Sequence, residues 1–261
     1  MNRLVMGLVA GAALVVFGAI AHADDTALTK GAANYKPYAV KHIEEALAGA
    51  KELQAAVKAG DVKAAQAAWI KSRKGWEASE PITGEFFSDL DEAIDAWPDS
   101  KKGYHAIEAA LFSDKLNEIG SPVDELVSNL EEFSKKLSDP SFSFTPQGLL
   151  NGATGLAYEV GENKSKGGES PYAGTSAVDM HENVEGIEAV YNLVFADALK
   201  SKDPKLAHKI DEQIETVEGL VRVKTLKELD QPKLSKAAEE LAVLMQSSAA
   251  PLGLEKPKLG D

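Results

Sequence analysis

The stretch KHIEEALAGAKELQAAVKAG, residues 41–60, sets the fold class because its apolar residues recur at the spacing of an α-helix. Alanine and leucine dominate the stretch, Gly60 ends it, and Asp61 can cap a following helix. The same helical spacing continues almost throughout the chain from Tyr35 onward, with no convincing alternation of the strand type. The sequence therefore predicts an all-α fold.

The helical runs number about eight, four before Pro140 and four after it. This count fits two packed four-helix bundles or one elongated bundle with crossovers. We expect residues 24–140 to form the first bundle and residues 141–261 the second. Within these, residues 81–99, bounded by prolines, are expected to be irregular, and residues 251–261 to be a frayed tail.

The first 23 residues have the features of a signal peptide. Arg3 provides a basic start, a long apolar run follows, and the small-residue motif AHA ends at Ala23. The apolar run is also long enough for an uncleaved membrane anchor. We expect cleavage after Ala23, which predicts an exported protein without membrane insertion after cleavage. We also expect the mature chain to be a monomer in the periplasm.

Composition excludes several classes of function. The chain has no cysteine, so disulfides, thiolate metal sites and cysteine nucleophiles are excluded. Neither a G-x-S-x-G serine motif nor a phosphate-binding P-loop motif occurs. The formal net charge of −13 repels nucleic acid and anionic membranes and attracts cations, although a solvated acidic surface accounts for it equally well.

The stretch GYHAIEAALF, residues 103–112, contains a histidine followed three residues later by a glutamate. On a helix, His105 and Glu108 share one face, and an imidazole with a carboxylate suits zinc, iron, manganese or copper. A simple His–Glu contact on a helix surface is the alternative. The apolar neighbours predict that this helix is buried, and a buried charged pair requires partners.

Acidic residues are concentrated just before this helix, and they are candidate oxygen ligands. A solvated acidic loop is the alternative interpretation. The seven residues are Glu77, Glu80, Glu85, Asp89, Asp91, Glu92 and Asp95.

A second group, in the stretch DMHENVE, is a candidate for another metal site. It contains Asp179, His181, Glu182 and Glu185, with His181 and Glu185 one helical turn apart. A network of charged side chains on a helix surface is the alternative.

These stretches resemble the imelysin-like family, and in particular its EfeO/EfeM-type periplasmic iron-uptake proteins. GYHAIE fits the family's G-x-H-x-x-E signature, and WEASEPI…GEFFSDLDEAIDAW resembles the segment before it. The second half, LLNGATGLAYEV…K…GGESPYAGTSAVDMHENVEGIEAVYNLV, resembles the stretch around the family's Asn-Val-Glu/Asp-Gly motif. The resemblance extends over roughly residues 35 to 250.

The resemblance implies four metal ligands: Glu80 of the Glu-Pro pair, Asp95 of the Ile-Asp pair, His105 and Glu108. Such carboxylate and imidazole donors suit iron or zinc and do not suit Cu(I), while zinc and copper remain alternatives to iron as the bound metal. The stretch between Asp95 and His105 is shorter than in EfeO proteins. The cupredoxin-like domain of many EfeO proteins is not expected, which makes the chain more similar to the short EfeM type.

The resemblance also implies a function. We expect a periplasmic protein, not an enzyme, that captures iron and passes it to an inner-membrane iron permease and its associated periplasmic proteins. One alternative is a zinc metallopeptidase of the imelysin type, although the H-E-x-x-H signature is absent. Another is a protein that binds a polysaccharide such as alginate through bridging cations.

Overall fold

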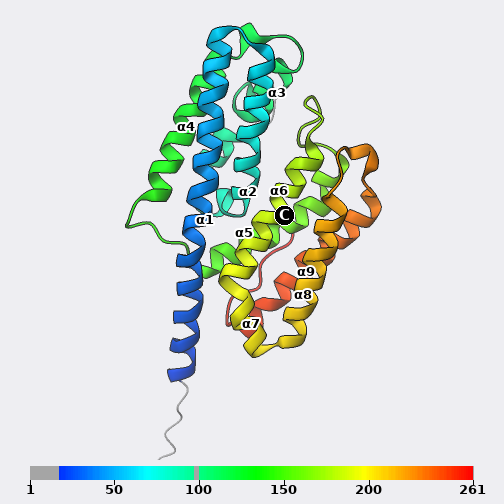
Figure 1. Ribbon diagram of the computed structural model, residues 1–261. Helices are drawn as coiled ribbons and strands as arrows, with labels where there is room; N and C mark the ends of the chain where they lie inside the picture. The colour runs from blue at the N-terminus through cyan, green and yellow to red at the C-terminus, as the bar shows by residue number, and fades with distance from the viewer. Residues whose placement is uncertain (1–17, 97–99, 261) are drawn as a thin grey trace, which may run out of the picture.

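The structure, a computed structural model, describes residues 18–96 and 100–260 (Figure 1). Most of the expected signal peptide, residues 1–17, lies outside the described residues. The described chain is helical and contains no strand. Its helices are α1 (Gly18–Ala59), α2 (Val62–Ile94), α3 (Gly103–Leu111), α4 (Gly120–Ser138), α5 (Pro146–Glu162), α6 (Ser176–Val190), α7 (Ala196–Lys202), α8 (Pro204–Val221) and α9 (Gln231–Leu252).

The expected number of helices and the all-α class are confirmed. One turn of π-helix, Tyr191–Phe195, joins α6 to α7 without interruption, so these two helices form one rod. Four helical rods then precede Pro140 and four follow it. No helix of the described residues has the length and apolarity needed to cross a lipid bilayer.

The helices form two bundles that lie side by side (Figure 1). Helices α1, α2 and α4 pack together with α3 against α2 and α4, while α5, α6, α8 and α9 form the second bundle with α7. Helix α2 also packs against α5 and α6, and the buried apolar side chains of both bundles make one continuous cluster. The division into domains at residue 140 stays a prediction; it falls in the link between α4 and α5.

Side-chain caps explain where several helices begin. Asp61 accepts a hydrogen bond from the backbone N–H of Ala64, and Thr145, Asp203 and Asp230 each accept one from the residue three positions later. Such caps satisfy N–H groups that have no partner within the helix. A proline follows the cap in the first turn of α5, α8 and α9, where its missing N–H costs nothing.

The expectation that residues 81–99 are irregular is wrong for residues 81–94, because α2 continues through Pro81 to Ile94. A proline inside a helix costs about 3 kcal/mol, so packing must compensate. A Cβ on Gly152 of α5 would lie 1.9 Å from the carbonyl oxygen of Pro81, and one on Gly186 of α6 would lie 2.6 Å from that of Ala78. These close approaches pack this turn of α2 against α5 and α6 of the second bundle. Within α2, only Phe87 departs from helical backbone angles, at φ −143° and ψ 38°.

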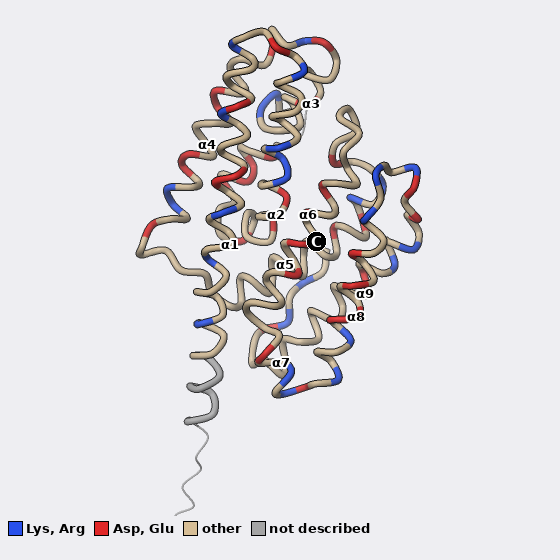
Figure 2. Tube along the Cα trace, viewed as in Figure 1, with Lys and Arg blue, Asp and Glu red and all other residues tan. Residues whose placement is uncertain are grey.

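The C-terminal residues are bound to the second bundle, so the expectation of a frayed tail is wrong for the described part. The backbone N–H of Glu255 donates to Oε1 of Gln147 at 2.7 Å, and Nε2 of Gln246 donates to the carbonyl oxygen of Pro257 at 2.7 Å. Charged residues of both signs lie along the helices of both bundles (Figure 2).

Candidate metal centre

A pocket of about 550 Å³ brings together three of the four predicted ligands, Glu80, Asp95 and His105. Glu80 lies in α2 directly before Pro81, and Asp95 directly follows the last residue of α2. His105 lies in the first turn of α3. The other lining residues are Asp91, Glu159, Asn163, Lys164, Lys166, Gly168 and Glu169.

The glycine of the G-x-H-x-x-E motif explains why His105 meets Asp95. Gly103 opens α3 at φ +73°, and a Cβ there would lie 2.5 Å from the carbonyl oxygen of Ile94. Only glycine lets the start of α3 approach the end of α2 so closely. As a result, Nε2 of His105 lies 3.3 Å from Oδ1 of Asp95.

Both side chains have shifted pKa values. Burial lowers the pKa of His105, while Asp95 opposes that shift. Burial alone would raise the pKa of Asp95, but the positive charge of Arg73 and the ring of His105 outweigh it and lower that pKa to about 2. At neutral pH the pocket therefore presents an ionised Asp95 and a neutral imidazole, which are the forms that bind metals.

Glu108, the fourth predicted ligand, is not among the residues that line the pocket. Its Oε1 accepts hydrogen bonds from the backbone N–H groups of Tyr172 at 2.9 Å and Ala173 at 2.8 Å. Burial raises the pKa of Glu108, and these two N–H groups act against that rise. Glu108 thus fastens the loop before α6 to α3.

Lys164 occupies the middle of a ring of carboxylates. Its Nζ lies 2.8 and 2.9 Å from the two carboxylate oxygens of Glu80, 3.3 Å from Oε2 of Glu169 and 3.7 Å from Oε2 of Glu77. The side chain of Lys164 is 4% exposed. Burial would lower its pKa, but Glu169, Glu80 and Glu77 raise it well above the usual value, so this ammonium is charged.

Arg73 is a second buried cation, one helical turn before Glu77 on α2. Its NH2 group lies 2.5 Å from Oε1 of Glu77 and 3.0 Å from Oε2 of Glu169, and its NH1 group donates to Asp95. The guanidinium therefore ties the end of α2 and the loop that carries Glu169 to the middle of α2.

Carboxyl groups outnumber cations in this cluster. Five buried or nearly buried carboxyl groups, Glu77, Glu80, Asp95, Glu169 and Asp179, face the two permanent cations Arg73 and Lys164. Burial raises the pKa of Glu80 to about 7 and raises the pKa of Glu77 and Asp179 well above the usual range. A shortage of positive charge of this kind favours the binding of a further cation.

Asn183 of α6 completes the contacts of the acidic pair on α2. Its Nδ2 donates to Oε2 of Glu77 at 2.7 Å and to Oε2 of Glu80 at 2.5 Å. The sequence patterns do not predict four residues of this cluster: Arg73, Lys164, Glu169 and Asn183. Lys164, Glu169 and Asn183 do lie in the second-half stretches that carry the family resemblance, and this was the available signal.

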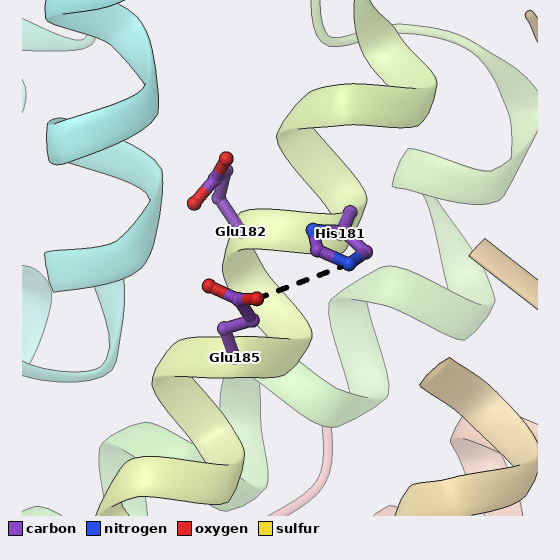
Figure 3. Close-up of side chains that lie close together, drawn as sticks. All are labelled: His181, Glu182 and Glu185. Carbon is purple, nitrogen blue, oxygen red and sulfur yellow. Dashed lines mark ion pairs between the residues drawn. The ribbon is translucent and has the colours of Figure 1, made fainter. Parts of the chain in front are cut away.

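The second predicted group comes together only in part. His181, Glu182 and Glu185 offer ligand atoms within 4.8 Å of one another on α6 (Figure 3). Nε2 of His181 lies 3.9 Å from Oε1 of Glu185, and Glu182 also pairs with Lys74. Asp179 lies apart from them, because its buried carboxylate accepts a hydrogen bond from Ser170.

The sequence of this chain is similar to a known family of proteins. The family model of imelysin, which carries the label of peptidase family M75, matches residues 31–102 and 100–249. The iron uptake system component EfeM of Pseudomonas syringae pv. syringae (strain B728a) is 31% identical over 218 residues, covering 80% of this chain and 74% of that protein.

Two further similarities extend this result. The iron uptake system component EfeO of Escherichia coli (strain K12) is 31% identical over 210 residues, which cover 76% of this chain and 55% of that protein. The chain thus spans little more than half the length of EfeO. A crystal structure provisionally named an iron-regulated protein A precursor, from Parabacteroides distasonis ATCC 8503, is 15% identical and has the same fold, with a TM-score of 0.71 over 87% of this chain and 95% of that one.

Proposed function

The chain belongs to the imelysin family, and from that premise we propose that it is a periplasmic protein that captures iron and delivers it to an inner-membrane transporter. In this proposal, the iron ion is the cargo. Glu80, Asp95 and His105 bind it in the pocket at the junction of α2 and α3. Glu108, which the family resemblance adds as a ligand, here supports the site by fixing the loop at Tyr172 and Ala173.

The observation that carries the proposal is the ring of carboxylates around the ammonium of Lys164. Three carboxylates converge within 2.8 to 3.7 Å of one positive charge, next to a fourth carboxylate and an imidazole. Holding so many carboxylates together away from water is costly unless cations neutralise them. The arrangement therefore suits a protein whose task is to hold a metal cation.

The chemistry of the donors and the names of the relatives both favour iron. Carboxylate oxygens with one imidazole suit Fe²⁺, Fe³⁺ or Zn²⁺ more than Cu(I), which prefers sulfur ligands. Relatives that share about a third of their residues with this chain are named iron uptake system components. The names of these relatives and the expected signal peptide support the proposed delivery to a transporter and the proposed periplasmic location.

We do not propose peptidase activity, although the family model carries a peptidase label. A zinc peptidase needs an open coordination position with a bound water and a general base beside it. The cations that pair with Glu80 and Asp95, Lys164 and Arg73, cannot act as that base, and the H-E-x-x-H signature of zinc peptidases is absent from the sequence.

The experiment that tests the proposal is a calorimetric titration of the chelator-stripped protein with Fe²⁺ under anaerobic conditions, alongside Fe³⁺ and Zn²⁺. We expect saturable binding of one iron ion per chain. The variant His181→Ala is the control, because it alters the partly exposed group on α6 and leaves the pocket intact. Weak, unsaturable binding of iron, or binding that His181→Ala removes, would contradict the proposal.

Iron binding is expected to strengthen with rising pH up to about 7 and then to level off. The carboxyl group of Glu80 has a pKa of about 7 and must lose its proton before it binds a metal. Below that pH each competing proton weakens binding by about tenfold per pH unit. Burial lowers the pKa of His105, so the contribution of this imidazole to the slope moves toward lower pH. Titrations between pH 5 and pH 8 measure the profile; a flat profile would contradict it.

The same pKa shift has the opposite effect on the metal-free protein. A carboxyl group whose pKa rises on folding stabilises the folded state at low pH and loses that contribution as the pH rises through the folded value. The contribution of Glu80 to the stability of the metal-free protein therefore falls between its ordinary value near 4.5 and about 7.

A further inference from the structure

The two buried cations of the site are carried by very different backbone segments. Arg73 lies in the interior of α2, a helix of 33 residues, and contacts three carboxylates at once. Lys164 begins a single turn of 3₁₀-helix, Lys164–Lys166, which ends at Gly167 with φ +88°. Lysine carries its ammonium on a flexible stem of four carbons. On such a short turn, the Lys164 side chain can change its rotamer without disturbing either bundle.

The contacts of Lys164 compete with those of a bound metal. Both carboxylate oxygens of Glu80 already lie within hydrogen-bond distance of its Nζ, at 2.8 and 2.9 Å. A metal ion bound to the same carboxylate needs an oxygen at about 2.0–2.2 Å. An ammonium and a metal ion crowded on one carboxylate would also repel each other strongly in a site shielded from water.

We propose that Lys164 is an internal counter-ion that the arriving metal cation displaces from the ring of Glu77, Glu80 and Glu169, and that returns when the cation leaves. The inference rests on the proposed function, that this pocket holds a cation. Uptake is then an exchange in which one positive charge leaves the ring and two or three enter it.

The surroundings of Lys164 allow such an exchange to stay local. Lys164 itself lines the pocket, so its ammonium can move outward through the pocket without leaving through packed side chains. The loop beyond it is fixed at two points: Glu108 accepts from Tyr172 and Ala173, and Asp179 accepts from Ser170. Between α5 and these anchors lies the short turn that carries Lys164.

An internal ammonium gives the site two properties. Without metal, it keeps the carboxylates of Glu77, Glu80 and Glu169 together, so the ligands are arranged before the metal arrives. It also selects by charge, because a monovalent ion that replaces the ammonium adds no positive charge to the ring, whereas Fe²⁺ adds one and Fe³⁺ adds two. Sodium and potassium should therefore leave Lys164 in place.

Chemical labelling of lysine amines tests the displacement in the unmodified protein. Acetylation with a succinimidyl ester, read by mass spectrometry, should find Lys164 protected without metal and labelled several-fold faster with saturating Fe²⁺. Lys136 is the internal control, because it pairs with Glu132 on the exposed surface of α4, outside the pocket, and its labelling should not change. Sodium in place of Fe²⁺ should leave Lys164 protected. Lys164 that stays protected in the iron-loaded protein would overturn the inference.

Titration of Lys164→Met with Fe²⁺ provides a second measurement, with Lys136→Met on the surface of α4 as the control. Removal of the competing ammonium should tighten iron binding about tenfold or more, whereas the control should match the wild type. Unchanged or weaker binding by Lys164→Met would overturn the inference while wild-type binding upholds the proposed function. Absence of binding by both proteins would overturn the proposed function and the inference together.

Discussion

Replacing Glu80 with glutamine is expected to weaken Fe²⁺ binding about 100-fold, or about 2.8 kcal/mol. Glu80 lines the pocket, and its carboxylate is held in place by Lys164 and Asn183. The glutamine keeps the size of the side chain but supplies only a neutral oxygen. Loss of residues that merely orient a metal ligand costs 10- to 100-fold in affinity, so loss of a charged ligand should cost at least the upper value.

The matched control is Glu85→Gln on the same helix. Glu85 has an exposed side chain that accepts a hydrogen bond from Asn151, and it does not line the pocket with Asp95 and His105. Both variants lose one negative charge, so a general effect of net charge would weaken binding equally in the two. Equal affinities of Glu80→Gln and the wild type would show that iron binds elsewhere.

Replacing Arg73 with methionine is expected to lower the free energy of unfolding by about 3–5 kcal/mol at pH 7. Arg73 is fully buried, and its loss leaves the carboxylates of Glu77, Asp95 and Glu169 without their shared partner. An uncompensated buried charge costs more than the ion pair contributes, because no water replaces the missing guanidinium. Urea unfolding of the metal-free protein measures the change.

The control for this prediction is Lys71→Met, two residues earlier on α2. Lys71 pairs with Glu52 at 2.6 Å on the surface, and an exposed pair contributes less than about 1 kcal/mol. The difference between the two variants should shrink at pH 5, because the carboxyl groups that Arg73→Met leaves behind can then take up protons. A loss of stability as small as that of Lys71→Met would contradict the role assigned to Arg73.

The positions of the helices along the chain could be predicted because they depend on local sequence patterns. Apolar residues at helical spacing and caps such as Asp61, Thr145 and Asp203 mark the helices. The continuation of α2 through Pro81 could not be predicted in this way. It depends on the close approach of Gly152 and Gly186, which lie more than 70 residues further along the chain.

The candidate site could be predicted only in part. The resemblance to imelysin-like proteins identified Glu80, Asp95 and His105, and these three do line one pocket. The role of Glu108 depends on the backbone N–H groups of Tyr172 and Ala173, which no sequence pattern reveals. Lys164 ends a helical run, directly before a stretch rich in glycine and serine, and nothing in this pattern indicates its burial among carboxylates.

The central claim is that iron binds among Glu80, Asp95 and His105, and anomalous diffraction at the iron absorption edge tests it most directly. Crystals of the iron-loaded protein should give one strong anomalous peak within bonding distance of carboxylate oxygens of Glu80 and Asp95 and a ring nitrogen of His105. A peak at His181, Glu182 and Glu185 instead, or no peak in protein that has bound iron in solution, would contradict the account.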